Sequence, residues 1–256
     1  SQIKETRPDF VYISYSDPGR SELVGFERPK TELHASLLHY GLIQLLWSFM
    51  PTAPLWLGDG LATYLKASVY DPDSGSFRWQ PNYAQLASLK SILKGPAKIT
   101  IEDLLVMDKA QAARQIAAFY PTAWGLVHFL TQSTEKRFNR LLWDSISAVR
   151  PESSLKENSG RIREQVFSWI DPDELQSAFE RYILGMKTFN ELVKEGTDLY
   201  AGSKLEEAEK AFATALELRA DSYIPYYYLG LIEYQRKNYA KAADHYSRAM
   251  ELGIEG

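Results

Sequence analysis

The chain has 256 residues, of which 45% are hydrophobic and 24% charged, and a formal net charge of −4, which is typical of one large globular domain or two of modest size. The small acidic charge and the lack of a long basic run give no support for a nucleic-acid partner, and no apolar run approaches the roughly 18 residues of a membrane helix. Because there is no cysteine, disulfides, cysteine-based zinc sites and a cysteine nucleophile are excluded.

Two β-strands are the first elements expected along the chain. Residues 9–15 are rich in β-branched and aromatic residues, residues 17–19 read Asp-Pro-Gly and predict a turn, and residues 22–26 can form the return strand. These are the only convincing strand signals. We therefore expect a small N-terminal β-hairpin ahead of a mainly α-helical chain.

Residues 31–64 predict two packed helices that are separated by a proline-bounded turn. The first helix has an apolar stripe at helical spacing, formed by Leu33, Leu37, Leu38, Gly41, Leu45 and Leu46. The second helix reads PLWLGDGLATYL over residues 54–65. Ordinary packing explains the stripe, but the combination of Trp56-Leu57 with Gly60-Leu61-Ala62 and Tyr64 is more specific than packing requires.

This segment resembles the peptidase-MA-like branch of the gluzincin zinc peptidases, whose second helix often reads W-L-x-E-G-L-A-x-Y. Gluzincins carry H-E-x-x-H on the first helix, because residues four apart share a face and both imidazoles reach one zinc, and the glutamate is the general base. Here His34 matches the first histidine, and Asp59 stands where the acidic ligand would be. Ala35 replaces the base and Leu38 replaces the second histidine. The resemblance thus implies a pseudoenzyme without metal or cofactor, in which His34 and Asp59 are structural remnants.

Two other readings of this segment remain open. The alternative is an active zinc metallopeptidase with an irregular site of His34, His39 and Asp59. His39 points about 140° away from His34 around the helix, so the helix would have to distort and another group, such as Glu32, would act as base. In the third reading the cleft keeps its shape without a metal and holds an extended peptide by strand addition.

The rest of the first half is expected to be helical. Residues 70–82 predict a solvated loop, because the ligand spacing of a calcium-binding loop is incomplete. Helices are expected at about 83–94, 101–107, 110–118 and 121–133, with Thr100 and Asp103 capping the second of them.

Residues 119–130 and 175–182 extend the resemblance to the peptidase-MA-like family. The implied fold is a helical, gluzincin-like (thermolysin-type) domain with a small N-terminal β remnant over residues 1–185. Tyr120 and His128 lie on an apolar segment and are expected to be packing residues rather than an oxyanion-stabilising group or a ligand. Relatives of this class are often bacterial and exported, which favours the periplasm or cell envelope over the cytoplasm only slightly.

From Phe189 the chain repeats itself at one fixed spacing, without a gap. Equivalent pairs are Gly196 and Gly230, Ala208 and Ala242, Phe212 and Tyr246, Ala215 and Ala249, and Leu218 and Leu252. The spacing and the small residues resemble tetratricopeptide repeats, which have a period of about 34 residues and paired helices that approach closely. We therefore expect an α-solenoid segment over residues 186–256, with two helix–turn–helix repeats at 189–222 and 223–256 and turns near Gly202 and Asn238.

Two such repeats need covering at both ends, since about three are usually required for stability. The helix around residues 173–185 is expected to cap one side. The other side has no obvious polar capping helix, so we expect further repeats or a partner to cover it.

The concave surface of such an array is formed by the first helix of each repeat. It is expected to carry the candidate partner-binding residues Val193, Thr197, Tyr200, Tyr227, Leu231 and Tyr234. An aromatic, weakly charged groove suits an extended peptide or a partner helix. Thr197 and Leu231 stand where a carboxylate-clamp repeat has asparagine, which disfavours capture of a C-terminal carboxylate. Packing against the first domain is the alternative use of this surface.

Together these patterns predict a non-catalytic interaction or scaffold protein. It would combine a pseudo-metallopeptidase domain with tetratricopeptide repeats that bind a peptide or a partner protein.

Overall fold

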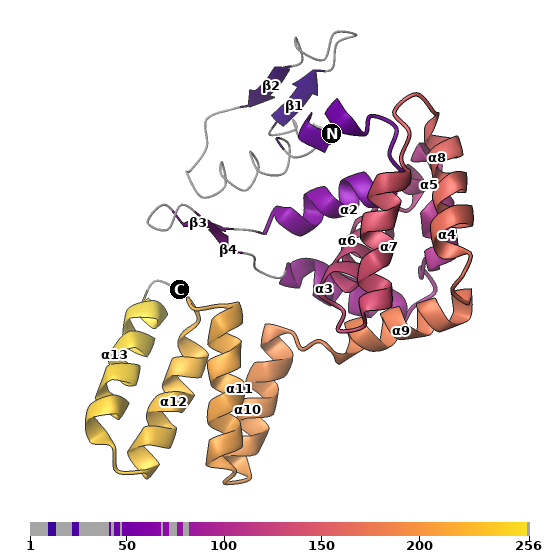
Figure 1. The fold of residues 1–256 in the computed structure, drawn as a ribbon. Helices are drawn as coiled ribbons and strands as arrows, with labels where there is room; N and C mark the ends of the chain where they lie inside the picture. Colours follow the sequence, from indigo (N-terminus) through magenta and orange to yellow (C-terminus); the bar gives the residue numbers. More distant parts are fainter. Residues whose placement is uncertain are drawn as a thin grey trace, which may run out of the picture. The chain divides into compact units, whose positions relative to one another are not determined.

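The structure is a computed structural model that describes residues 10–13, 22–25, 41, 44–46, 48–67, 69–71, 76–78 and 82–254. Within these residues the chain is mainly helical (Figure 1). It divides into two compact units, residues 1–184 and 185–256. In the described part of the chain no helix is both long enough and apolar enough to cross a membrane.

Two short antiparallel strand pairs lie in the first unit. Strand β1 (Phe10–Ile13) pairs with β2 (Glu22–Gly25), inside the two segments where strands are expected. Strand β3 (Val69–Asp71) pairs with β4 (Ser76–Arg78). The prediction of a plain loop over residues 70–82 is therefore wrong. Strands as short as β3 and β4 cannot show an alternating pattern that would reveal them.

The first unit is organised around one central helix, α6 (Ile116–Gln132), which contacts α2 (Leu55–Leu65) and four other helices. Nearly all residues of α6 from Ala118 to Leu130 are buried, as expected for a helix that is apolar on every side. Its neighbours and the helices that follow are α3 (Tyr83–Leu93), α4 (Ile101–Val106), α5 (Lys109–Arg114), α7 (Lys136–Ala148), α8 (Leu155–Ile162), the π-helix η2 (Arg163–Phe167) and α9 (Pro172–Gly185).

The bounds of α5 and α6 differ from the expected helices at 110–118 and 121–133. The break lies at Gln115, and Pro121 stands inside α6 rather than at its start. A continuous helix places Phe119 and Trp124 in the core, where each is at most 2% exposed. The free energy gained by burying these two side chains offsets the cost of the backbone hydrogen bond that Pro121 cannot donate. The expected cap at Thr100 is confirmed, because its Oγ1 accepts a hydrogen bond of 3.1 Å from the backbone N–H of Asp103.

The second unit consists of two helical hairpins. The first pairs α10 (Phe189–Ala201) with α11 (Leu205–Leu218), and the second pairs α12 (Tyr223–Gln235) with α13 (Tyr239–Ile254) (Figure 1). In each hairpin an aromatic ring of the second helix lies directly against a glycine of the first. A Cβ atom on Gly196 would lie 2.7 Å from the ring of Phe212, and one on Gly230 would lie 2.6 Å from the ring of Tyr246. The two glycines that recur in sequence thus make the same contact in each hairpin.

The turns inside the two hairpins also recur at equivalent positions of the two repeats. Ser203 and Lys237 have φ angles of 59° and 64°, in the left-handed region. The residue after each donates its N–H to a carbonyl near the end of the preceding helix, Lys204 to Leu199 and Asn238 to Glu233, both at 2.9 Å. This pattern ends a helix with one left-handed residue. In the first hairpin that residue is Ser203 rather than its neighbour Gly202.

We expect Gly196→Ala to lower the free energy of unfolding of the second unit by about 1–3 kcal/mol, because the new methyl group overlaps the ring of Phe212, which is fully buried. Gly230→Ala should cost less, since Tyr246 is only half-buried and its ring can shift. The control is Gly160→Ala in α8, where a Cβ meets nothing within 4 Å and better helix propensity should stabilise by up to about 1 kcal/mol. Urea denaturation followed by circular dichroism measures all three, and equal effects at Gly196 and Gly160 would contradict this account.

Candidate functional site

The candidate zinc-site residues of the first helix lie outside the described residues. These are His34, Ala35, Leu38 and His39, so Asp59 is the one candidate zinc-site residue that lies within the described part of the chain. Asp59 lies on α2 and is half-buried. Burial raises the pKa of its carboxyl to about 6, and the charge of Lys109 lowers it in part. Among the described residues no three His, Cys, Asp or Glu side chains come together as metal ligands.

Most of the other residues of the W-L-x-x-G-L-A-x-Y pattern are buried on α2. A Cβ atom on Gly60 would lie 2.7 Å from the carbonyl oxygen of Ala123, so only glycine lets the two helices approach this closely. Trp56 is fully buried. The hydroxyl oxygen of Tyr64 accepts a hydrogen bond of 2.8 Å from Gln132 Nε2. The α2–α6 contact therefore accounts for Gly60 and Tyr64, while the ring of Trp56 lies against that of Phe167 in η2.

His128 is buried in the same region, with 2% of its surface exposed. Its Nδ1 lies 2.9 Å from the hydroxyl of Tyr182, and its ring lies against those of Tyr64 and Trp124. Burial lowers the pKa of His128 to about 4, which keeps the imidazole neutral at physiological pH. The environment is that of a packed aromatic histidine, as expected from the apolar segment around it.

The candidate partner-binding residues of the first repeat are half-buried on α10. Thr197 donates a hydrogen bond of 2.8 Å from Oγ1 to the carbonyl oxygen of Val193, one turn earlier. Val193 packs against the cluster of Phe189 and its neighbours. The hydroxyl oxygen of Tyr200 accepts a hydrogen bond of 2.7 Å from Gln235 Nε2, on α12. Tyr200 thus connects the two repeats.

The candidate residues of the second repeat lie on α12, where Leu231 is half-buried and the two tyrosines are more exposed. Tyr227 and Tyr234 are 47% and 57% exposed. They gather with Tyr200 around Tyr246 of α13: burial raises the pKa of Tyr246, and the neighbouring phenols of Tyr227, Tyr200 and Tyr234 raise it further. The ring centroids of Tyr227 and Tyr246 are 6.1 Å apart. Sequence reasoning placed Tyr246 in the repeat but missed it as a member of this tyrosine cluster.

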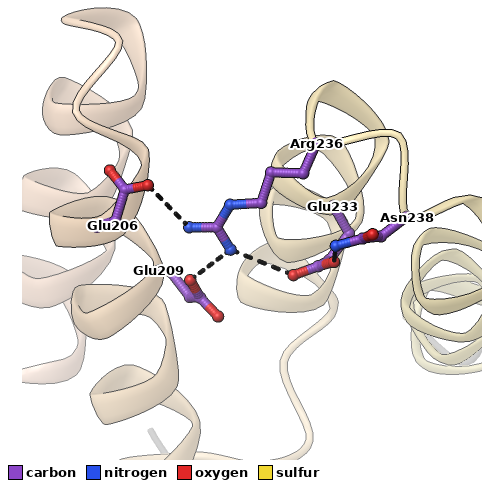
Figure 2. A network of polar contacts seen from close by, with 5 residues as sticks. All are labelled: Glu206, Glu209, Glu233, Arg236 and Asn238. Carbon is purple, nitrogen blue, oxygen red and sulfur yellow. Dashed lines mark hydrogen bonds and ion pairs between the residues drawn. The ribbon is translucent and has the colours of Figure 1, made fainter.

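A network of charged side chains connects α11 to α12, and no sequence signal predicted it (Figure 2). Arg236 Nη1 lies 2.6 Å from Glu209 Oε2 and 3.3 Å from Glu233 Oε1, and its Nη2 lies 3.4 Å from Glu206 Oε1. Asn238 Nδ2 donates to Glu233 Oε2 at 2.7 Å. The hydrogen bond from Asn238 lowers the pKa of Glu233, burial opposes it, and the hydrogen bond from Arg236 lowers it again.

Comparison with protein families found one match, which lies in the second unit. The tetratricopeptide repeat family model matches residues 193–254. This part of the chain carries tetratricopeptide repeats. The prediction made from the fixed spacing in the sequence is confirmed for these residues. No match was found among curated proteins or among solved structures, so the resemblance of the first unit to peptidase-MA-like proteins stays a prediction.

We expect Glu233→Gln to destabilise the tetratricopeptide repeats by about 1–2 kcal/mol at pH 7, because it removes the charge that Arg236 and Asn238 bind, in a site that is partly open to solvent. The pKa of Glu233 is lowered in the folded state, so its contribution is present above the unfolded pKa of about 4.5 and is lost as the pH falls below it. The difference between the two proteins should therefore vanish on acidification.

Urea denaturation at a series of pH values from neutral to strongly acidic measures this difference. Glu217→Gln, at an exposed position of α11, is the matched control and should leave stability unchanged. A difference between wild type and Glu233→Gln that persists at acid pH would contradict the assignment.

Proposed function

We propose that this chain is a non-catalytic interaction protein whose repeats bind an extended peptide or a partner helix. The proposed binding surface is the face of α10 and α12 that carries Val193, Thr197, Tyr200, Tyr227, Leu231 and Tyr234. The family match supports protein–protein interaction in general. The finer proposal rests on one observation: the exposed rings of Tyr227 and Tyr234 lie against tyrosines of α13, with ring centroids 6.1 Å from Tyr246 and 5.5 Å from Tyr239.

The chemistry of this face favours an uncharged ligand segment. The six proposed residues carry no formal charge. Tyrosine offers a large flat apolar surface together with a hydroxyl group that can both donate and accept hydrogen bonds. Such side chains are frequent among the residues that contribute most to binding. An extended peptide with apolar or aromatic side chains, or the apolar face of a partner helix, fits this pattern best.

The proposed domain organisation is a degenerate peptidase-MA-like domain over residues 1–185, followed by repeats at 189–222 and 223–256. One observation supports a structural use of the remnant motif: Gly60 and Tyr64 take part in the α2–α6 contact.

The partner-binding proposal is tested by selecting peptides on the full chain from a displayed random library. Selected peptides should bind Tyr227→Ser and Tyr234→Ser at least about tenfold more weakly than wild type, since each change removes a ring from the proposed surface. Tyr223→Ser is the matched control, because Tyr223 is 51% exposed on the same helix but outside the proposed surface. Peptides that lose affinity for the control and not for the other two variants would contradict the proposal.

The absence of catalysis is tested by metal analysis of the purified chain after incubation with zinc. We expect no stoichiometric zinc, because Ala35 and Leu38 cannot act as base and ligand. One tightly held zinc per chain, together with chelator-sensitive peptide hydrolysis that His34→Ala abolishes, would establish the irregular site of His34, His39 and Asp59 instead.

A further inference from the structure

The first unit has a cavity where the start of α4, the π-helix η2 and the start of α9 come together. Its volume is about 250 Å³. The inner wall is apolar and buried, and the mouth is exposed to solvent. The inner wall consists of Ile101, Leu105, Phe167, Ile170 and Leu175, and the mouth consists of Glu102, Arg163, Glu164, Ser168 and Pro172. None of these residues belongs to the proposed binding surface of the repeats or to the zinc-peptidase resemblance.

The walls of the cavity are held by contacts within the first unit. The ring of Phe167 lies edge-on to that of Trp56, which is fully buried, with ring centroids 6.1 Å apart. The backbone N–H of Ile101 donates a hydrogen bond of 2.8 Å to Gln176 Oε1, which connects the start of α4 to α9. The cavity is therefore formed before any ligand binds, as small-molecule sites usually are.

The π-helix and a small side chain leave this space unfilled. The π-helix η2 contributes Arg163, Glu164 and Phe167 to the lining, and Ser168 follows directly after it. π-Helical segments are rare and occur frequently at functional sites. Apolar walls that face an unfilled space lose packing contacts, which costs stability. A ligand with an apolar body would supply those contacts.

The charges at the mouth favour a cation. Glu102 and Glu164 carry two negative charges, and Arg163 carries one positive charge. Arg163 Nη2 lies 3.7 Å from Glu164 Oε1, so these two charges offset each other in part. Within the described part of the chain, Glu102 has no ion-pair partner. The mouth thus keeps an excess of negative charge beside an apolar interior, which attracts a positively charged ligand.

An anion is disfavoured, although two helices begin at this cavity. A helix start binds anions through free backbone N–H groups. Here Pro172 has no N–H, that of Ile101 is donated to Gln176, and that of Asp103 is donated to Thr100 Oγ1. Both helices also have two acidic side chains in the first turn, which offset the positive end of the helix dipole.

We propose that this cavity binds a small organic amine. The protonated nitrogen lies at the mouth beside the carboxylate of Glu102, and the apolar body lies against Leu105 and Phe167. An engineered apolar cavity of about 150 Å³ holds a benzene molecule. The larger cavity of this protein therefore has room for one aromatic ring and a short side chain. This site is independent of partner binding by the repeats.

Three probes that share a phenylethyl body test the proposal on the full chain: phenethylamine, phenethyl alcohol and phenylpropionate. They differ in charge, being positive, neutral and negative at pH 7. Methyl NMR titrations measure affinity and location together, because Ile101, Leu105, Ile170 and Leu175 carry methyl groups in the inner wall. We expect the amine to bind with a dissociation constant on the order of 1 mM, followed by the alcohol and then the carboxylate.

Substitutions at the mouth separate charge recognition from filling of the cavity. Glu102→Gln should weaken the amine about two- to fivefold and leave the alcohol unchanged, and Arg163→Gln should strengthen the amine by a similar factor. Ser168→Phe should weaken both probes, because the ring occupies the cavity. The matched control is Glu152→Gln, at an exposed position outside the cavity, which should change neither affinity. Circular dichroism confirms that each variant is folded.

Four outcomes would overturn the proposal. The first is saturable binding by none of the three probes, and the second is tighter binding of the carboxylate than of the amine. The third is an affinity for the amine that responds to neither Glu102→Gln nor Arg163→Gln. The fourth is a set of amine-induced shifts that avoids the four inner-wall residues whose methyl groups are observed. Amine binding that follows the two charge changes in opposite directions, with shifts at the inner wall, would establish the site.

Discussion

The close approach of two helices over a glycine is the contact on which the second unit depends. In each hairpin an aromatic ring of the second helix lies where the first helix has no side chain, Phe212 on Gly196 and Tyr246 on Gly230. A Cβ at either glycine would lie too close to the ring for any real contact. This contact fixes the rotation of both helices about their axes, and hence which residues face the core, the proposed binding surface and the next repeat. The left-handed turn residues Ser203 and Lys237 keep the same spacing as the two glycines, so the whole hairpin recurs as one unit.

Although the two hairpins have the same backbone arrangement, the exposed sides of α10 and α13 differ in chemistry. One side of α12 packs against α11. The equivalent side of α10 carries lysine, glutamate and aspartate residues that form ion pairs, as residues on a solvated surface do. The corresponding end on α13 carries alanine, serine, tyrosine and methionine. Where the two repeats meet, Arg236 forms ion pairs with glutamates of α11 that have no equivalent in the second repeat. The join between the two repeats thus combines apolar packing with the ion pairs of Arg236, whereas α13 has an uncharged surface.

The sequence predicted best where one physical cause produced a repeating signal. The fixed spacing revealed the repeats because Gly196 and Gly230 meet the same steric demand. It could not reveal the Arg236 network, whose members have no equivalents in the other repeat, or the role of Tyr246, whose neighbours come from other helices.

In the first unit, Pro121 was expected to start a helix, but the helix α6 begins before it, because a continuous helix buries Phe119 and Trp124. The β3–β4 hairpin was missed because its strands are too short to carry a period. Around Asp59, Gly60 and Tyr64 take part in the α2–α6 contact, so packing alone accounts for these two positions of the pattern.

The central claim is that the uncharged first-helix surface of the repeats holds the partner. Hydrogen–deuterium exchange of the full chain, with and without a peptide selected from a displayed library, tests it most directly. The account predicts slower exchange in α10 and α12, strongest around Tyr227–Tyr234, with little change in α2 to α8. Protection that is confined to the first unit, or to the charged side of α10 around Lys194 and Asp198, would contradict it.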